Sequence, residues 1–228
     1  MRNVKIIIQK QLMDTLKNKT VLIQFVLFPL MTLVMENAIH VEGMPPLFFT
    51  KLFSVMYMGM APLTAAASII SEEKEKNTLR VLTMANVKSW EYLLGVGAYV
   101  WALCMAGTLV MASGFEKSLI PFYLLVMGLG LALSVGAGAC VGIWAKNQMV
   151  ATSLVMPVML VLSFMPMLAM FNETIEKAAR FFYTQQVRTL LNDMTLAGLG
   201  IGDAMILAAN ALLMGLLFFT AFRRKGLE

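Results

Sequence analysis

The segment 71–95, SEEKEKNTLRVLTMANVKSWEYLLG, carries a dense run of charge between two stretches that are apolar enough to lie in lipid. Four glutamates between positions 72 and 91 nearly balance three lysines and one arginine. A segment that only anchors a loop at a membrane surface needs basic residues alone. Mixed charge followed by the apolar residues of 79–84 suits a docking element, because charges orient it and an apolar ridge fills a groove on a partner.

The motifs of common catalytic sites do not occur in the sequence. There is no GxxxxGK[ST] phosphate-binding loop and no HExxH, CxxC or GxSxG motif. The single histidine, His40, falls in a predicted loop, where a solvated role fits better than metal binding. The 21 methionines fit flexible packing better than a metal site, because Met56 and Met60 share a helix face but Met58 does not. We therefore expect no enzyme activity, no cofactor and no metal.

The composition is that of an integral membrane protein. The 228 residues are 59% hydrophobic and 14% charged, with a mean hydropathy of +0.77, whereas soluble proteins are roughly 45–50% apolar and about 25% charged. Basic residues flank apolar spans, so the positive charge does not imply nucleic-acid binding. About 20 apolar residues cross a bilayer. Six windows are candidates: 20–35, 47–70, 92–113, 119–144, 149–170 and 203–222. The first is short as written and is expected to extend to about Ala38, with Glu36 near an interface.

Lysine and arginine are distributed unequally between the two sides of these windows. The side that holds both termini and the loops at 71–91 and 145–148 carries thirteen of them, and the other side carries five. The excess of basic residues predicts that both termini are cytoplasmic. We therefore expect one all-α transmembrane domain, 1–228, with six spans. Gln24 and Asn210 are its deeper polar residues, and either could form a hydrogen bond to another helix.

Residues 1–19 have the pattern of an amphipathic helix. Val4, Ile8, Leu12 and Leu16 recur every four residues, with polar residues on other faces. This predicts an interfacial helix that lies along the inner membrane surface. The alternative is a cytoplasmic extension of the first span.

Small residues form a stripe along the fourth window. Gly130, Ser134, Gly138 and Gly142 repeat every four residues, so another helix could approach this face closely. Ordinary helix packing is the simpler interpretation, and a pathway lining is the alternative.

The long connection 171–202 lies on the outer side of the predicted topology. Its pattern predicts two short amphipathic helices with a break around 183–185. Asn172 is expected to cap the first helix, with Glu173 and Glu176 in its opening turn.

The segment 71–95 resembles the inner loop of the membrane subunits of type-2 ABC exporters. The family pattern is an acidic and basic run, here 72–76, then Thr-Leu at 78–79, a short apolar helix at 81–84, a break at 85–87 and a glutamate at the start of the third span. Two positions depart from it, because Asn77 stands where the family often has glycine and Asn86 stands where it has proline. The overall plan of the chain is also similar to that family.

This resemblance implies that 71–91 is a cytoplasmic coupling loop that binds a separate ATP-binding subunit. The implied contact residues are Glu72, Glu73, Thr78, Leu79, Leu82 and Met84. The N-terminal helix would brace the same subunit, and the helices of 171–202 would cap the exit path. The chain would pair with a second copy or a paralogous membrane subunit in a bacterial cytoplasmic membrane. Its apolar composition suggests a hydrophobic or amphipathic cargo, such as a peptide, drug or lipid.

Two other functions would require features of their own in the sequence. A secondary transporter or channel driven by an ion gradient is the main alternative, but it would be expected to have charges at mid-membrane or inverted repeats. An intramembrane enzyme would need a nucleophile and base, or metal ligands, within the spans. The sequence shows neither set of features.

Overall fold

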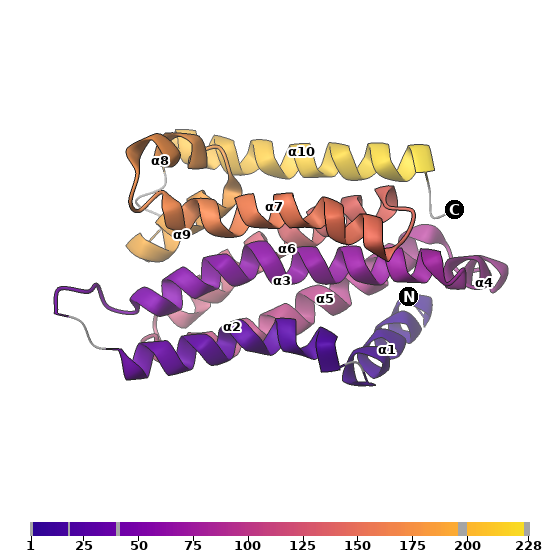
Figure 1. Ribbon diagram of the computed structural model, residues 1–228, viewed down its shortest axis with the longest axis horizontal. Helices are drawn as coiled ribbons and strands as arrows, with labels where there is room; N and C mark the ends of the chain where they lie inside the picture. The colour runs from indigo at the N-terminus through magenta and orange to yellow at the C-terminus, as the bar shows by residue number, and fades with distance from the viewer. Residues whose placement is uncertain (1, 18, 40–41, 196–199, 226–228) are drawn as a thin grey trace.

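The structure, a computed structural model, describes residues 2–17, 19–39, 42–195 and 200–225, and these residues form helices joined by turns, with no strand among them. The helices are α1 (Arg2–Lys17), α2 (Lys19–Ala38), α3 (Phe48–Glu75), α4 (Thr78–Met84), α5 (Ser89–Met111), η1 (Ala112–Gly114), α6 (Ile120–Trp144), α7 (Gln148–Leu168), α8 (Glu173–Ala179), α9 (Tyr183–Asp193) and α10 (Ile201–Lys225). The long helices run along one another (Figure 1). At one end, called here the α4 end, α1 and α4 lie together, while α8 and α9 lie at the opposite end (Figure 1).

Five helices within the described residues are long and apolar enough to cross a membrane: α3, α5, α6, α7 and α10. The 20-residue helix α2 contains Pro29, and its described apolar part, Leu22–Ala38, is shorter than those five. Each of the six predicted windows coincides with one of these helices. The described residues thus have the helical architecture and the long apolar helices of a membrane protein.

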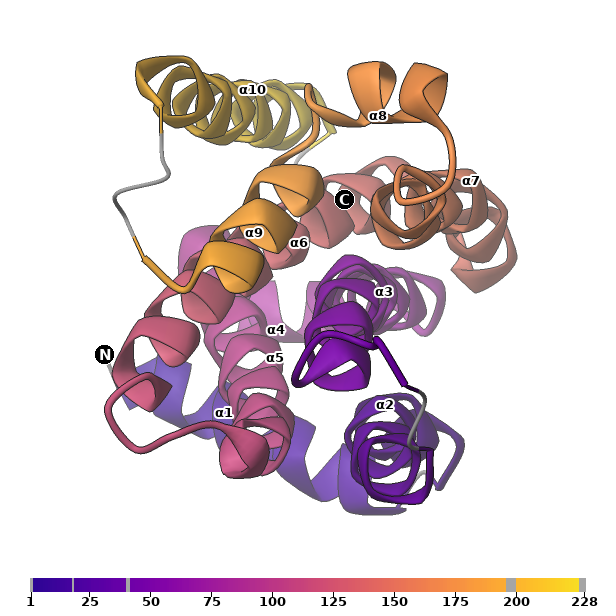
Figure 2. The same cartoon turned by 90° about the vertical axis from the view of Figure 1, so that its left-hand side faces the viewer.

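Helix α3 forms the centre of the bundle. In its most apolar window 72% of the residues are buried, whereas only 6% are buried in the corresponding window of α10. It packs chiefly against α6 and α7 and also contacts α2, α5 and α9, and the view along the bundle shows it between α7 and α2, with α5 and α6 beside it (Figure 2). Tyr57, Met58, Leu63 and Ile70 are fully buried on it. The positions of the other helices are thus set relative to α3.

The small-residue stripe of α6 lies against α3. A Cβ atom added at Gly138 would stand 2.4 Å from the backbone oxygen of Leu63, and one at Gly142 would stand 2.8 Å from Cβ of Ile70. At Gly130 it would overlap the sulfur of Met58. Glycine is needed at these positions because the two helix backbones approach too closely for a side chain.

Helix α3 extends beyond its predicted window, which ended at residue 70. Its 28 residues make a rod of about 42 Å at 1.5 Å per residue, longer than the roughly 30 Å of hydrocarbon in a bilayer. The extra turns carry the charged residues that follow position 71. Glu72 and Lys76 pair one turn apart, which favours continuation of the helix.

The predicted cap of α8 is confirmed, and the predicted break after it is displaced. The side chain of Asn172 accepts hydrogen bonds from the backbone N–H groups of Thr174 (2.9 Å) and Ile175 (3.3 Å). The break falls at 180–182, and α9 already begins at Tyr183. The reason is that the hydroxyl of Tyr183 is bound to Ser134 on α6 at 2.6 Å, which fixes the first turn of α9.

We expect Gly138→Ala to lower the free energy of unfolding by about 1–3 kcal/mol, because the added methyl group overpacks the contact between α3 and α6. The measurement is unfolding in mixed detergent micelles. Gly136→Ala on the same helix is the matched control, since a Cβ atom there meets nothing within 4 Å. Equal stability of the two variants would contradict the packing described here.

Candidate functional site

The α4 end of the bundle holds the segment that the sequence singled out. After α3 ends at Glu75, Asn77 takes a left-handed backbone conformation with φ of 57°. The hydroxyl of Thr78 donates to the backbone oxygen of Glu73 at 3.0 Å. Thr78 also begins α4, which is seven residues long. Helix α4 is thereby held in a fixed direction relative to α3.

A second asparagine ends α4. Asn86 has φ of 61°, and the N–H group of Val87 donates to the backbone oxygen of Leu82 at 3.0 Å. Asparagine tolerates this conformation, whereas proline is locked near a φ of −65°. A proline at position 86 could therefore not form this turn. At position 77 the conformation is one that glycine also adopts easily.

One face of α4 is attached to the bundle and the other is open. Leu79 is buried with 4% of its surface exposed, and Leu82 packs against the core. Val81 and Met84 are 64% and 76% exposed, and Arg80 is exposed beside them. The open face therefore combines apolar side chains with a positive charge at the tip of the molecule (Figure 1).

Glu73 lies inside the protein, although the sequence analysis took it for an outward contact. Only 6% of its surface is exposed. One of its carboxylate oxygens accepts hydrogen bonds from Nζ of Lys10 at 2.6 Å and from Nε2 of Gln11. Glu72, one residue earlier, is rotated by about 100° on the helix and stays partly exposed, paired with Lys76. That hydrogen bond raises the pKa of Lys76.

Two other glutamates of the segment also connect parts of this chain. Glu75 accepts a hydrogen bond from the backbone N–H group of Gln148, the first residue of α7, at 2.9 Å. Glu91 accepts from the side chain of Asn3 at 2.9 Å and from the backbone N–H group of Lys88 at 3.1 Å. Three of the four glutamates thus connect separate helices of the chain, and Glu72 pairs with Lys76, which explains much of the mixed charge without a partner.

Helix α1 lies across the α4 end, at an angle to α2 (Figures 1 and 2). The face that it buries is formed by Ile7, Gln11 and Thr15, with 3%, 4% and 5% of their surfaces exposed. Ile7 fits against α5 where Gly95 leaves room, since a Cβ atom at Gly95 would stand 2.7 Å from Cγ2 of Ile7. This inward face is offset from the predicted stripe at positions 4, 8, 12 and 16.

The predicted stripe of α1 occupies the border of this face. Val4 and Ile8 are half-buried and Leu12 is 45% exposed, while the side chain of Leu16 lies outside the described part of the chain. Hydrophobicity alone did not select Gln11 and Thr15 as inward residues. The buried face of α1 is determined by two residues on other helices: Gly95, which leaves room for Ile7, and Glu73, which needs a hydrogen-bond donor. The sequence alone does not show that either residue lies next to α1.

At the opposite end, α9 enters the bundle and is fixed by polar contacts. Arg188 donates to the backbone oxygen of Pro166 at 2.7 Å, and burial lowers the pKa of Arg188. Asn210 donates to the backbone oxygen of Phe181 at 2.9 Å. Together with the hydrogen bond from Thr64 to Gln24 at 3.1 Å, this confirms that both deep polar residues bond to other segments.

Comparison of the sequence with protein-family models gives no match, and comparison with curated proteins gives none either. Among the residues that the structure describes, no group of three or more His, Cys, Asp or Glu side chains could hold a metal ion. His40 lies outside the described residues.

We expect Glu73→Ala to release α1, because Lys10 and Gln11 lose their shared acceptor. The expected cost is about 1–3 kcal/mol, typical of a charged hydrogen bond, and hydrogen exchange of the α1 amides should speed up accordingly. Glu72→Ala is the matched control, since its pair with Lys76 is exposed to solvent and contributes little to stability. Unchanged exchange in Glu73→Ala would show that this carboxylate does not hold α1.

The backbone of Asn77 gives a second prediction. Asn77→Val should lower the free energy of unfolding by about 1–2 kcal/mol, because a β-branched residue is strained in the left-handed region. Asn77→Gly should be at least as stable as the wild type, and the same detergent unfolding experiment measures both. If valine and glycine behave alike, the turn between α3 and α4 is not fixed as described.

Proposed function

We propose that this chain is the membrane subunit of an ABC exporter and that α4 is its coupling helix. The observation that carries the proposal is the exposed apolar tip of α4, Val81 and Met84, on a helix that is fixed to α3 through Leu79 and the turn at Asn77. A short, rigidly attached helix with an open apolar ridge is suited to fill a groove on a partner. The resemblance of 71–95 to the inner loop of such exporters gives the class of that partner.

The contact surface in this proposal differs from the set of residues that the resemblance implies. Glu73 and Leu79 face inward, so they position the surface without belonging to it. The proposed contact residues are Glu72, Arg80, Val81 and Met84, with the half-buried Thr78 and Leu82 at the edge. Movement of the partner against this surface would reach α3 directly and α1 through Glu73.

The remaining features of the proposal rest on the sequence. Six spans, counting α2, with both termini and α4 in the cytoplasm, follow from the excess of basic residues on that side. The absence of a phosphate-binding loop assigns ATP hydrolysis to a separate subunit. The chain would pair with a second copy or a paralogue in a bacterial cytoplasmic membrane and export a hydrophobic or amphipathic compound. Helices α8 and α9 would then cover the outer end of the route.

The test is co-purification in detergent with the ATPase subunit encoded beside this chain. We expect the double variant Val81→Asp, Met84→Asp to lose binding, because two charges replace the apolar ridge. The matched control is Phe171→Asp, a substitution of an apolar side chain that is 77% exposed at the opposite end. Hydrogen exchange of α1 checks that each variant keeps its fold.

Full binding by the double variant would remove α4 from the interface. If the wild type binds no ATPase and its transport depends on a proton or sodium gradient, the chain is a secondary transporter. The charged segment would then serve only the internal contacts described above.

A further inference from the structure

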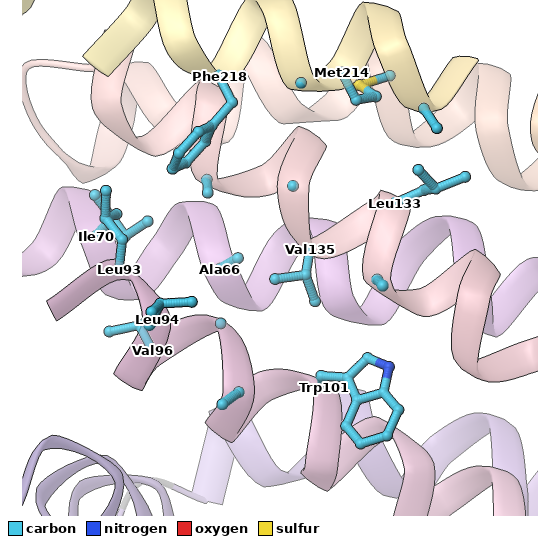
Figure 3. Close-up of a pocket in the computed structure, with 17 residues that line it drawn as sticks. Ala66, Ile70, Leu93, Leu94, Val96, Trp101, Leu133, Val135, Met214 and Phe218 are labelled. Atoms are coloured by element: carbon cyan, nitrogen blue, oxygen red, sulfur yellow. The ribbon is translucent and has the colours of Figure 1, made fainter. Parts of the chain in front are cut away.

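Helix α10 stands away from the bundle over part of its length and leaves a groove. The groove has a volume of about 580 Å³, within the range of roughly 300–1000 Å³ that is usual for binding sites of small molecules. It is lined by 66–70 of α3, 93–101 of α5, 132–139 of α6 and 211–218 of α10. Figure 3 shows Met214 and Phe218 of α10 on one side of it and Val135 and Trp101 on the other.

The lining is apolar throughout. Small residues supply much of it, including Gly97, Gly136 and Gly215 from three different helices. The only polar side-chain atom among the lining residues, Nε1 of Trp101, already donates to the backbone oxygen of Gly128 at 2.8 Å. A polar or charged ligand would therefore find no partner on these walls.

The groove lies within the depth of one leaflet. Each lining segment lies in the half of its helix nearer the α4 end, or at the midpoint. From Ala211 to Phe218 it extends for about 10 Å at 1.5 Å per residue, within the thickness of one leaflet, which is half of the roughly 30 Å of hydrocarbon. Trp90, half-exposed, stands about one turn beyond it on α5, where an amphipathic ring marks the headgroup level.

We infer that this groove binds one acyl chain of a phospholipid from the leaflet on the α4 side. The surrounding medium of these helices is lipid, and an empty apolar groove would forfeit the contacts of its walls. The acyl chain would fill the space between 211–218 of α10 and the facing helices, between the contacts that α10 makes at Asn210 and at the fully buried Ala221. The inference requires only that the helices span a membrane, so it stands apart from the proposed export function.

The test uses substitutions that fill the groove without disturbing the bundle. A Cβ atom at Gly136 or Gly215 meets nothing within 4 Å, so Gly136→Leu and Gly215→Leu place a side chain in the open space. Gly202→Leu is the matched control, because that glycine is also open but does not line the groove. Native mass spectrometry of the full chain from mild detergent counts the phospholipids that remain bound.

We expect the wild type and Gly202→Leu to keep about one phospholipid per chain and both groove variants to lose it severalfold. Equal lipid retention in all four proteins would overturn the inference. So would a change in the proportion of dimers without a change in lipid, which would assign the groove to a second copy of the chain.

A second measurement reports on the groove in a bilayer. With Trp90→Phe and Trp144→Phe, Trp101 is the only tryptophan left, and vesicles of phosphatidylcholine brominated on the acyl chain quench a tryptophan that the chain touches. Gly136→Leu should reduce this quenching, and Gly202→Leu should not. Identical quenching in these two variants would show that no acyl chain reaches Trp101 through the groove.

Discussion

The close approach of α3 and α6 is the contact on which the other positions depend. Lipid offers no hydrophobic driving force between helices, so association rests on tight van der Waals packing. Gly138 and Gly142 permit that packing, and a side chain at either would collide with the backbone or Cβ of α3. Because α3 is held along its length by α6 and α7, its charged end is presented beyond the apolar region in one fixed orientation.

The charged end of α3 positions α4, α1 and the start of α7 at the α4 end. An isolated helix of seven residues would not be stable in water, so α4 depends on Leu79 and on the turns at Asn77 and Asn86. Glu73 and Glu75 are two residues apart on α3 and point in different directions, so they reach α1 and α7 respectively. A force on α4 would therefore pass to three helices through hydrogen bonds and buried contacts, and it would not be absorbed by a flexible loop.

The sequence predicted the features that depend on local chemistry. The apolar windows, the cap at Asn172 and the two short helices of 171–202 follow from hydropathy and from side-chain capping, and they were found. The direction of each glutamate was not predictable, because Glu72 and Glu73 differ only in helix rotation and the position of α1 decides which one is buried. The face of α1 depends on the gap at Gly95, a contact between distant residues that periodicity does not report. The break before α9 depends in the same way on a hydrogen bond to Ser134.

The groove beside α10 was the least predictable feature, because small residues in a membrane helix usually indicate close packing. Helix α6 shows both close packing and an open groove at its glycines: Gly138 contacts α3, whereas Gly136 faces open space. What holds α10 is Asn210, which binds Phe181 just before α9, and α9 is in turn bound to α6 through Tyr183. Asn210 lies near the middle of α10, and Ser134 lies near the middle of α6. Closer to α4, Ala221 is fully buried against the bundle, so the groove beside 211–218 lies between two places where α10 is held. In a bilayer, hydrocarbon chains are available to fill that space.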